Sequence, residues 1–173
     1  MKFLKNNRKS RCFTFLELMV VLIITAVFLA IAAPKLGSFY DSVKLDGCAR
    51  QFKLLLMYAR NTALAERRIC QVYWVADKNK FILKIQASPI KNPELYKLVQ
   101  RNISQVKLGA GLKLFKAQKL GARPANTNQD FSFLIHPMGS KSKYYFVFKG
   151  AHDDEITVII EPGSGIVNIK KGD

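Results

Sequence analysis

An apolar segment near the N-terminus constrains this chain more than any other feature. Residues 13–33 read FTFLELMVVLIITAVFLAIAA and contain one charged side chain, that of Glu17. A helix of this length spans ~30 Å, which matches the hydrocarbon core of a bilayer. We therefore expect residues 13–34 to form a transmembrane helix.

The charges before this segment predict its orientation. Five basic residues and no acidic residue precede it: Lys2, Lys5, Arg8, Lys9 and Arg11. By the positive-inside rule, such a stretch stays in the cytoplasm, and the rest of the chain faces the other side of the membrane. The alternative is a cleaved secretory signal peptide, for which residues 30–32 offer a site of the A-x-A type. Against it, the apolar run is long, begins with a carboxylate and leads directly into another helical pattern.

Glu17 is the most informative residue of the segment. A carboxylate within an apolar span costs ~2–3 kcal/mol unless it is shallow or paired. The span contains no lysine or arginine. A cationic partner must therefore come from the flank, from another chain or from a new N-terminus.

Residues 11–17, RCFTFLE, resemble the processing motif of type IV prepilins, which is Gly followed by Phe-Thr-Leu-x-Glu and an apolar helix. The matching positions are Phe13, Thr14 and Glu17. Cys12 stands where the family has glycine. Pro34 falls where pilin-like proteins carry a helix-bending proline.

The resemblance implies a processing and assembly pathway. Prepilin peptidase would cut between Cys12 and Phe13, remove residues 1–12 as a basic leader and methylate the new N-terminus at Phe13. The resemblance also supplies the missing cation, because Glu17 would pair with the α-amino group of a neighbouring subunit's Phe13. The chain would then be a single-pass protein of the bacterial inner membrane, with a periplasmic globular domain.

Residues 35–67 are predicted to form an amphipathic stem helix. Its apolar positions recur at steps of three and four: Leu36, Phe39, Tyr40, Val43, Gly47, Cys48, Phe52, Leu55, Leu56, Ala59 and Ala63. We expect the C-terminal half of this stripe to pack on its own domain and the N-terminal half to pack against other subunits. Pro34 should kink the helix where it meets the apolar segment.

Cys48 and Cys70 would be candidates for a disulfide in an exported domain, but helix geometry argues against that pairing. Cys48 lies ~27 Å from the C-terminal end of a helix over residues 36–67, at ~1.5 Å per residue, and Cys70 follows that end. Bridged cysteines need Cα atoms within ~7 Å of each other. Both are therefore interpreted as small buried apolar residues.

After the helix, the apolar period changes to two and predicts an antiparallel β domain over residues 68–173. We expect hairpins at 69–76 with 80–87 and at 104–108 with 112–117, separated by a loop at 88–102. Residues 119–130 are predicted to form a surface loop. Four short strands are expected at 131–136, 144–149, 156–161 and 166–170. The predicted fold class is α+β, with the kinked helix packed on a sheet or sandwich.

These later segments sharpen the resemblance. Residues 49–75 look like the helix-to-strand junction of the pseudopilin H and FimT-like family, and residues 131–169 look like its C-terminal sheet. The similarity is absent over 88–130, where family members vary. The pilin-like fold is thus an expectation for nearly the whole chain.

No catalytic constellation is visible, and we expect neither an enzyme nor a cofactor. The two histidines, His136 and His152, belong to no Ser/His/Asp or Cys/His arrangement. Residues 153–155, DDE, offer oxygen ligands for calcium but lack the EF-hand pattern. A solvated hairpin tip is the favoured interpretation, with no metal site.

The favoured function is that of a minor pseudopilin in a type II secretion pseudopilus, supporting protein export across the outer membrane. Its expected partners are other pilin-like subunits, prepilin peptidase, the inner-membrane secretion platform and membrane lipid.

The alternative is a FimT-like minor type IV pilin with a role in pilus assembly or DNA binding and uptake. Without the five leader cations, 23 basic and 12 acidic residues remain, a net charge of +11. That charge suits anionic lipid, acidic protein or nucleic acid alike. A single-pass signalling or enzymatic ectodomain would leave the prepilin-like motif unexplained.

Overall fold

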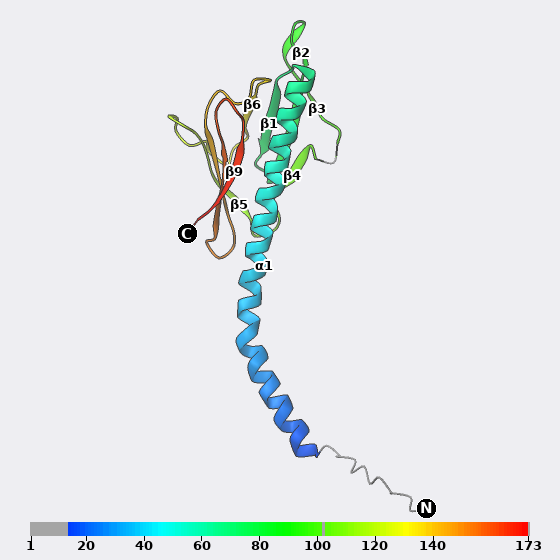
Figure 1. Cartoon of the computed structure of the whole chain (residues 1–173), viewed down its shortest axis with the longest axis vertical. Helices are drawn as coiled ribbons and strands as arrows, with labels where there is room; N and C mark the ends of the chain where they lie inside the picture. Colours follow the sequence, from blue (N-terminus) through cyan, green and yellow to red (C-terminus); the bar gives the residue numbers. More distant parts are fainter. Residues whose placement is uncertain (1–13, 102, 173) are drawn as a thin grey trace, which may run out of the picture. The chain divides into compact units, whose positions relative to one another are not determined.

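The computed structural model describes residues 14–101 and 103–172, apart from the side chains of residues 32–36 and 38. Cys12 and Phe13, between which cleavage is expected, lie outside the described residues. The chain divides into two compact units, residues 1–39 and 40–173. Helix α1 (Phe15–Glu66) provides the helical part of the first unit and opens the second (Figure 1).

In the first unit, α1 continues through Pro34 without a gap in its helical assignment. The kink expected at Pro34 stays a prediction. Among the described residues, no helix combines the length and the hydropathy by which a membrane-spanning segment is identified.

The second unit combines the later part of α1 with two antiparallel sheets. The first sheet has the order β3-β2-β1-β6, with β4 also paired to β2, and the second has the order β5-β7-β8-β9. Within the described residues the strands are β1 (Cys70–Val75), β2 (Lys80–Ser88), β3 (Asn92–Leu98), β4 (Gln105–Lys107), β5 (Lys113–Lys119), β6 (Phe131–Ile135), β7 (Tyr144–Lys149), β8 (Glu155–Ile160) and β9 (Val167–Lys171).

Aromatic side chains join the helix to both sheets. The ring centroid of Phe52 on α1 lies 4.3 Å from that of Phe81 on β2 and 5.1 Å from that of Phe146 on β7. Trp74 on β1 packs against Phe81 at 4.6 Å and donates an indole hydrogen bond of 2.9 Å to the carbonyl oxygen of Thr127. The helix buries Leu45, Cys48, Ala49, Phe52, Leu55, Leu56, Ala59 and Ala63 against this core. The C-terminal half of the predicted stripe therefore packs on its own unit, as expected.

The strand predictions are correct in part. The first hairpin is confirmed, because β1 pairs with β2 and Val75 lies opposite Lys80. The second is wrong, because β4 pairs with β2 whereas β5 pairs with β7. Residues 109–111 therefore carry the chain from one sheet to the other. The predicted loop at 88–102 contains β3, where Pro93 is tolerated because β3 is an edge strand.

The four C-terminal strands are present, but they do not form one sheet. β6 pairs with β1 in the first sheet, whereas β7, β8 and β9 follow one another in the second. Cys48 and Cys70 are both buried and free, as predicted.

Candidate assembly helix

Thr14 caps the first turn of α1. The backbone N–H of Glu17 donates a 3.2 Å hydrogen bond to Thr14 Oγ1, and the N–H of Leu18 donates to the Thr14 carbonyl oxygen at 3.2 Å. Thr14 and Glu17 stand at the N-cap and N3 positions of a capping box, in which each side chain can satisfy a free backbone N–H. This local role was not predicted from the sequence, although the T-x-x-E spacing is typical of a capping box.

The carboxylate of Glu17 is exposed in that first turn. The positive end of the helix dipole favours an anionic side chain there. None of the ion pairs formed among the described residues includes Glu17. Because Phe13 lies outside the described residues, the expected pairing with a neighbouring α-amino group stays a prediction.

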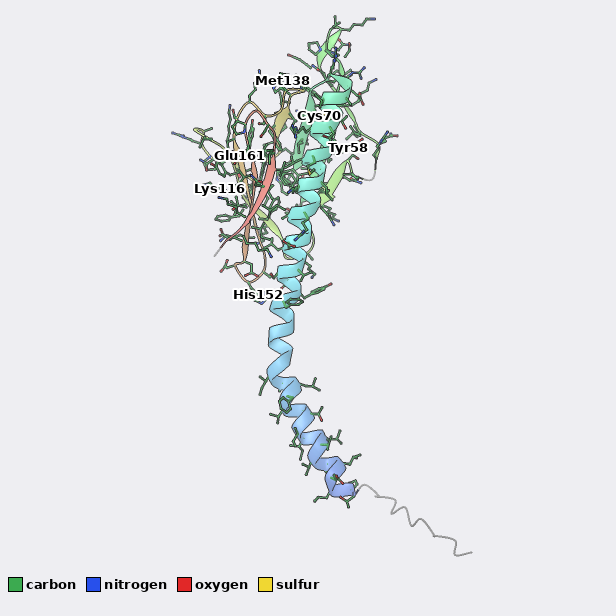
Figure 2. All side chains as sticks on the ribbon, viewed as in Figure 1. Tyr58, Cys70, Lys116, Met138, His152 and Glu161 are labelled. Carbon is green, nitrogen blue, oxygen red and sulfur yellow. The ribbon has the colours of Figure 1, made fainter. Side chains whose placement is uncertain are left out.

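The helical residues that follow are apolar on every side. From residue 18 to residue 31 the only polar side chain is that of Thr25, and its hydroxyl donates to the carbonyl oxygen of Val21. In Figure 2, side chains project from this part of α1 on more than one side. The exposed apolar side chains are Phe15, Leu16, Leu18, Met19, Val20, Val21, Leu22, Ile23, Ile24, Val27, Phe28, Leu29 and Ile31. A helix that is hydrophobic all round needs an apolar environment, from lipid or from other helices.

A second row of exposed apolar side chains follows the stem helix within the second unit, residues 40–173, which is the globular unit of the chain. Tyr40 and Val43 are exposed, as expected for the N-terminal half of the stem. Leu54, Met57 and Leu64 extend the row on the helix side that turns away from the core, with exposed fractions of 55%, 45% and 59%. These three are not part of the apolar stripe predicted from the sequence, which contains the positions that face the core. Their steps of three and seven place them on one face.

Polar contacts connect the stem helix to the second sheet. Asp46 lies 2.7 Å from Arg50 Nε and 3.7 Å from Lys171 Nζ. The hydrogen bond from Arg50 lowers the pKa of the Asp46 carboxyl below its ordinary value. Asp41 lies 3.2 Å from Nδ1 of His152, which belongs to the turn between β7 and β8. These contacts hold that turn and the last strand against the helix.

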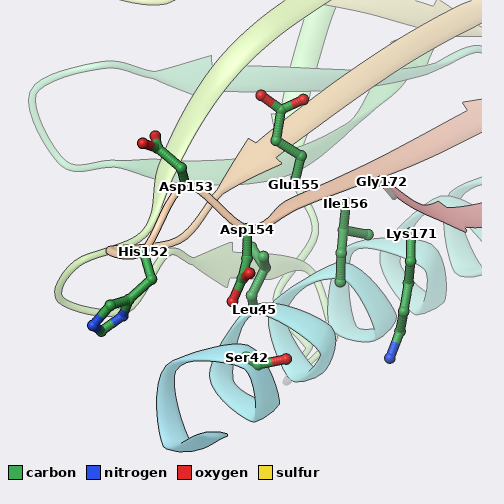
Figure 3. Close-up of a pocket in the computed structure, with 9 residues that line it drawn as sticks. All are labelled: Ser42, Leu45, His152, Asp153, Asp154, Glu155, Ile156, Lys171 and Gly172. Atoms are coloured by element: carbon green, nitrogen blue, oxygen red, sulfur yellow. The ribbon is translucent and has the colours of Figure 1, made fainter. Parts of the chain in front are cut away.

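An open cavity of about 350 Å³ lies beside these polar contacts (Figure 3). Its acidic residues do not converge, since Asp153 and Asp154 point in different directions and Glu155 binds Lys149 Nζ at 2.7 Å. Among residues 14–101 and 103–172, no three histidine, cysteine or acidic side chains are grouped to hold a metal ion. His136 follows β6 and forms an isolated bridge with Gly139, and burial lowers its pKa.

Comparison with known proteins identifies the N-terminal motif and the fold. Residues 7–33 match the family described as the prokaryotic N-terminal methylation motif. No curated protein matches the chain significantly.

Two structures of the minor pseudopilin EpsH from the type II secretion system of Vibrio cholerae are similar, with TM-scores of 0.57 and 0.54 at 13% identity. They cover 75% and 74% of this chain and 96% and 97% of their own. The type IV minor pilin FimU from Pseudomonas aeruginosa aligns with a TM-score of 0.48 and 18% identity, over 78% of this chain and 97% of its own. The motif and the EpsH-like α+β fold confirm the resemblance to type IV pilin-like proteins.

Proposed function

We propose that this pilin-like chain is a minor pseudopilin, a non-catalytic subunit of a type II secretion pseudopilus. One combination of features supports the proposal most directly. Residues 7–33 match a methylation motif whose helical part is apolar on every side, and the following unit has the fold of EpsH. A filament subunit needs an apolar helix that packs against the same helix of other subunits. It also needs a folded unit attached to that helix.

The proposed mechanism is assembly. Prepilin peptidase removes residues 1–12 at the Cys12–Phe13 bond, and residues 13–34 anchor the chain in the inner membrane with the globular unit in the periplasm. Neighbouring subunits then pack their apolar helices together. The methylated α-amino group of one subunit's Phe13 pairs with Glu17 of the next, which sets their register. The inner-membrane secretion platform drives growth of the filament, which supports protein export across the outer membrane.

The capping box gives Glu17 a second, local role, and Glu17→Gln separates that role from the role of the charge. Glutamine at the N3 position still caps a helix, so Glu17→Gln keeps the local hydrogen bonds and removes the charge. Thr14→Ser is the matched control, because serine keeps the capping oxygen.

The variants are expressed in cells that make the other subunits, and incorporation is measured as the fraction of the chain cross-linked to them in membranes. Loss of one partner of a desolvated ion pair costs ~3–5 kcal/mol, so Glu17→Gln should lower incorporation at least about tenfold. Thr14→Ser should incorporate normally. Normal incorporation of Glu17→Gln would refute the pairing.

Mass spectrometry of the native N-terminus tests the processing step, for which we expect N-methylated Phe13. Deletion of the chain should reduce export of secreted proteins across the outer membrane. A chain that retains Met1 in cells with active prepilin peptidase would contradict the proposal.

A further inference from the structure

The strands at the edges of the two sheets differ in how they are protected. An edge strand presents unpaired backbone groups that can pair with another chain, and lysine or proline in the strand usually prevents this pairing. In the described part of the chain, the edge strands are β3, β4 and β6 in the first sheet and β5 and β9 in the second. Four of them carry lysine: Lys97 in β3, Lys107 in β4, Lys113, Lys116 and Lys119 in β5, and Lys170 and Lys171 in β9. Only β6, with the sequence FSFLI, has neither a charge nor a proline.

Within residues 14–101 and 103–172, the outer edge of β6 has no backbone partner. β6 pairs with β1 along one side, with Tyr73 opposite Ser132. Among the described residues, no other backbone hydrogen bond reaches residues 131–135. Ser132 is exposed, and its hydroxyl accepts a 2.9 Å hydrogen bond from Gln71 on β1. The free side of β6 is thus open to a further strand.

A pocket of about 230 Å³ adjoins that free edge. It is lined by residues of β5, the 120–130 loop, β6 and β7. Its aromatic wall is packed, since the Phe133 ring centroid lies 5.3 Å from that of Tyr144 and 4.9 Å from that of Phe146. The volume suits one apolar side chain, such as phenylalanine or leucine. Alternate residues of an added strand point toward the same side of the sheet, so one of them can enter the pocket.

The charges at the pocket are all of one sign. Lys119 and Arg123 line it and are exposed, and no acidic residue is among its lining residues. Asp130 comes directly before β6, but its carboxylate accepts hydrogen bonds from the Tyr73 hydroxyl at 2.8 Å and the Ala76 N–H at 2.9 Å. The two cations therefore favour an occupant that carries carboxylates.

We propose that the β6 edge and this pocket form a strand-addition site for an extended, acidic segment of a partner protein. The segment pairs its backbone with β6, inserts one apolar side chain into the pocket and places carboxylates near Lys119 and Arg123. A second copy of this chain is the wrong occupant, because its edge strands β3, β4, β5 and β9 carry lysine and its own β6 brings no carboxylate to Lys119 and Arg123. The site lies wholly within residues 117–146, so it does not depend on the proposed membrane anchoring or filament role.

The probe is a fluorescein-labelled peptide, Thr-Asp-Ser-Phe-Thr-Asp-Val-Ser, in which both aspartates lie two residues from the phenylalanine and so point to the same side of the strand. It is titrated with the full chain in detergent micelles, and binding is followed by fluorescence polarisation. We expect saturable binding. Lys119→Glu with Arg123→Glu should weaken it at least about tenfold, because charge-assisted contacts are lost. Lys107→Glu with Lys113→Glu changes the net charge equally at exposed sites outside the pocket, and it should change affinity less than about twofold.

Backbone N-methylation distinguishes strand addition from simple charge attraction. In an antiparallel pair, successive residues of the added strand alternate in direction, so only one alternating set of its amides faces β6. One of two peptides N-methylated at alternate residues should therefore bind like the parent, and the other should not bind. Equal binding of both, an equal loss in the two charge-reversal variants, or no saturable binding below about 1 mM would overturn the proposal. Self-association of the chain that Ser132→Lys abolishes would assign the edge to a second copy and overturn it as well.

Discussion

Replacing Gly139 with alanine would push a methyl group into the backbone of a neighbouring turn. Gly139 lies between β6 and β7 with a φ of 94°, in the left-handed region. A Cβ atom at this position would stand 2.1 Å from the carbonyl oxygen of Gly163, in the turn between β8 and β9. The N–H of Gly163 donates a 2.9 Å hydrogen bond to the carbonyl oxygen of Ser140. The two turns therefore cannot separate without losing this bond.

The expected loss of stability combines three contributions. A positive φ costs an alanine ~1–2 kcal/mol relative to glycine. Loss of the Gly163 hydrogen bond costs ~1 kcal/mol, and overpacking against a backbone oxygen costs ~1–3 kcal/mol. Gly139→Ala should thus lower the free energy of unfolding by ~3–6 kcal/mol. Gly121 is the matched control, because its φ is 79° but a Cβ atom there would have no neighbour within 4 Å. Gly121→Ala should lose only the ~1–2 kcal/mol of the backbone contribution.

Guanidinium unfolding followed by tryptophan fluorescence measures this difference. Trp74 is the only tryptophan and has an exposed fraction of 1%, so its emission reports the core of the globular unit. The full chain is used in detergent, and the two glycine variants are compared with the parent. Equal destabilisation by both variants would refute the role assigned to the contact between the turns.

Two further predictions concern titratable groups of the globular unit. Arg50, with a smaller contribution from Lys171, lowers the pKa of the Asp46 carboxyl in the folded chain. The ionised carboxyl therefore stabilises the fold at a pH above its ordinary pKa of 3.8. This stabilisation is lost as the pH falls through the folded pKa. Acid unfolding of the parent should therefore show a larger loss of stability below about pH 4 than that of Asp46→Asn, and parallel pH curves would contradict this. Burial raises the pKa of the Cys48 thiol to about 11 and that of Cys70 to about 12. Both thiols should therefore resist alkylation by iodoacetamide at about pH 8 in the folded chain and react in guanidinium. Peptide mass spectrometry maps the labelled positions. Rapid labelling of both thiols in the folded protein would show that the core opens.

The sequence alone was sufficient where the physical signal is local. The apolar run and the 3.6-residue period predicted α1, because the contacts that stabilise a helix lie three and four residues apart. The same period predicted which stem positions are buried, among them Phe52 and Ala59. The first hairpin was predictable because its turn spans few residues. The prepilin-like motif was readable because it is a contiguous stretch of sequence.

Only the tertiary structure decided which distant strands pair. β6 joins β1 across a long separation in sequence, and β4 and β5 enter different sheets although they are neighbours along the chain. No local pattern specifies such pairing, because strands gain their stability from cross-strand neighbours that the sequence does not place. The unpaired edge of β6 and the pocket beside it arise from the same assembly of distant segments. Both depend on how β1 and residues 117–146 are placed in space.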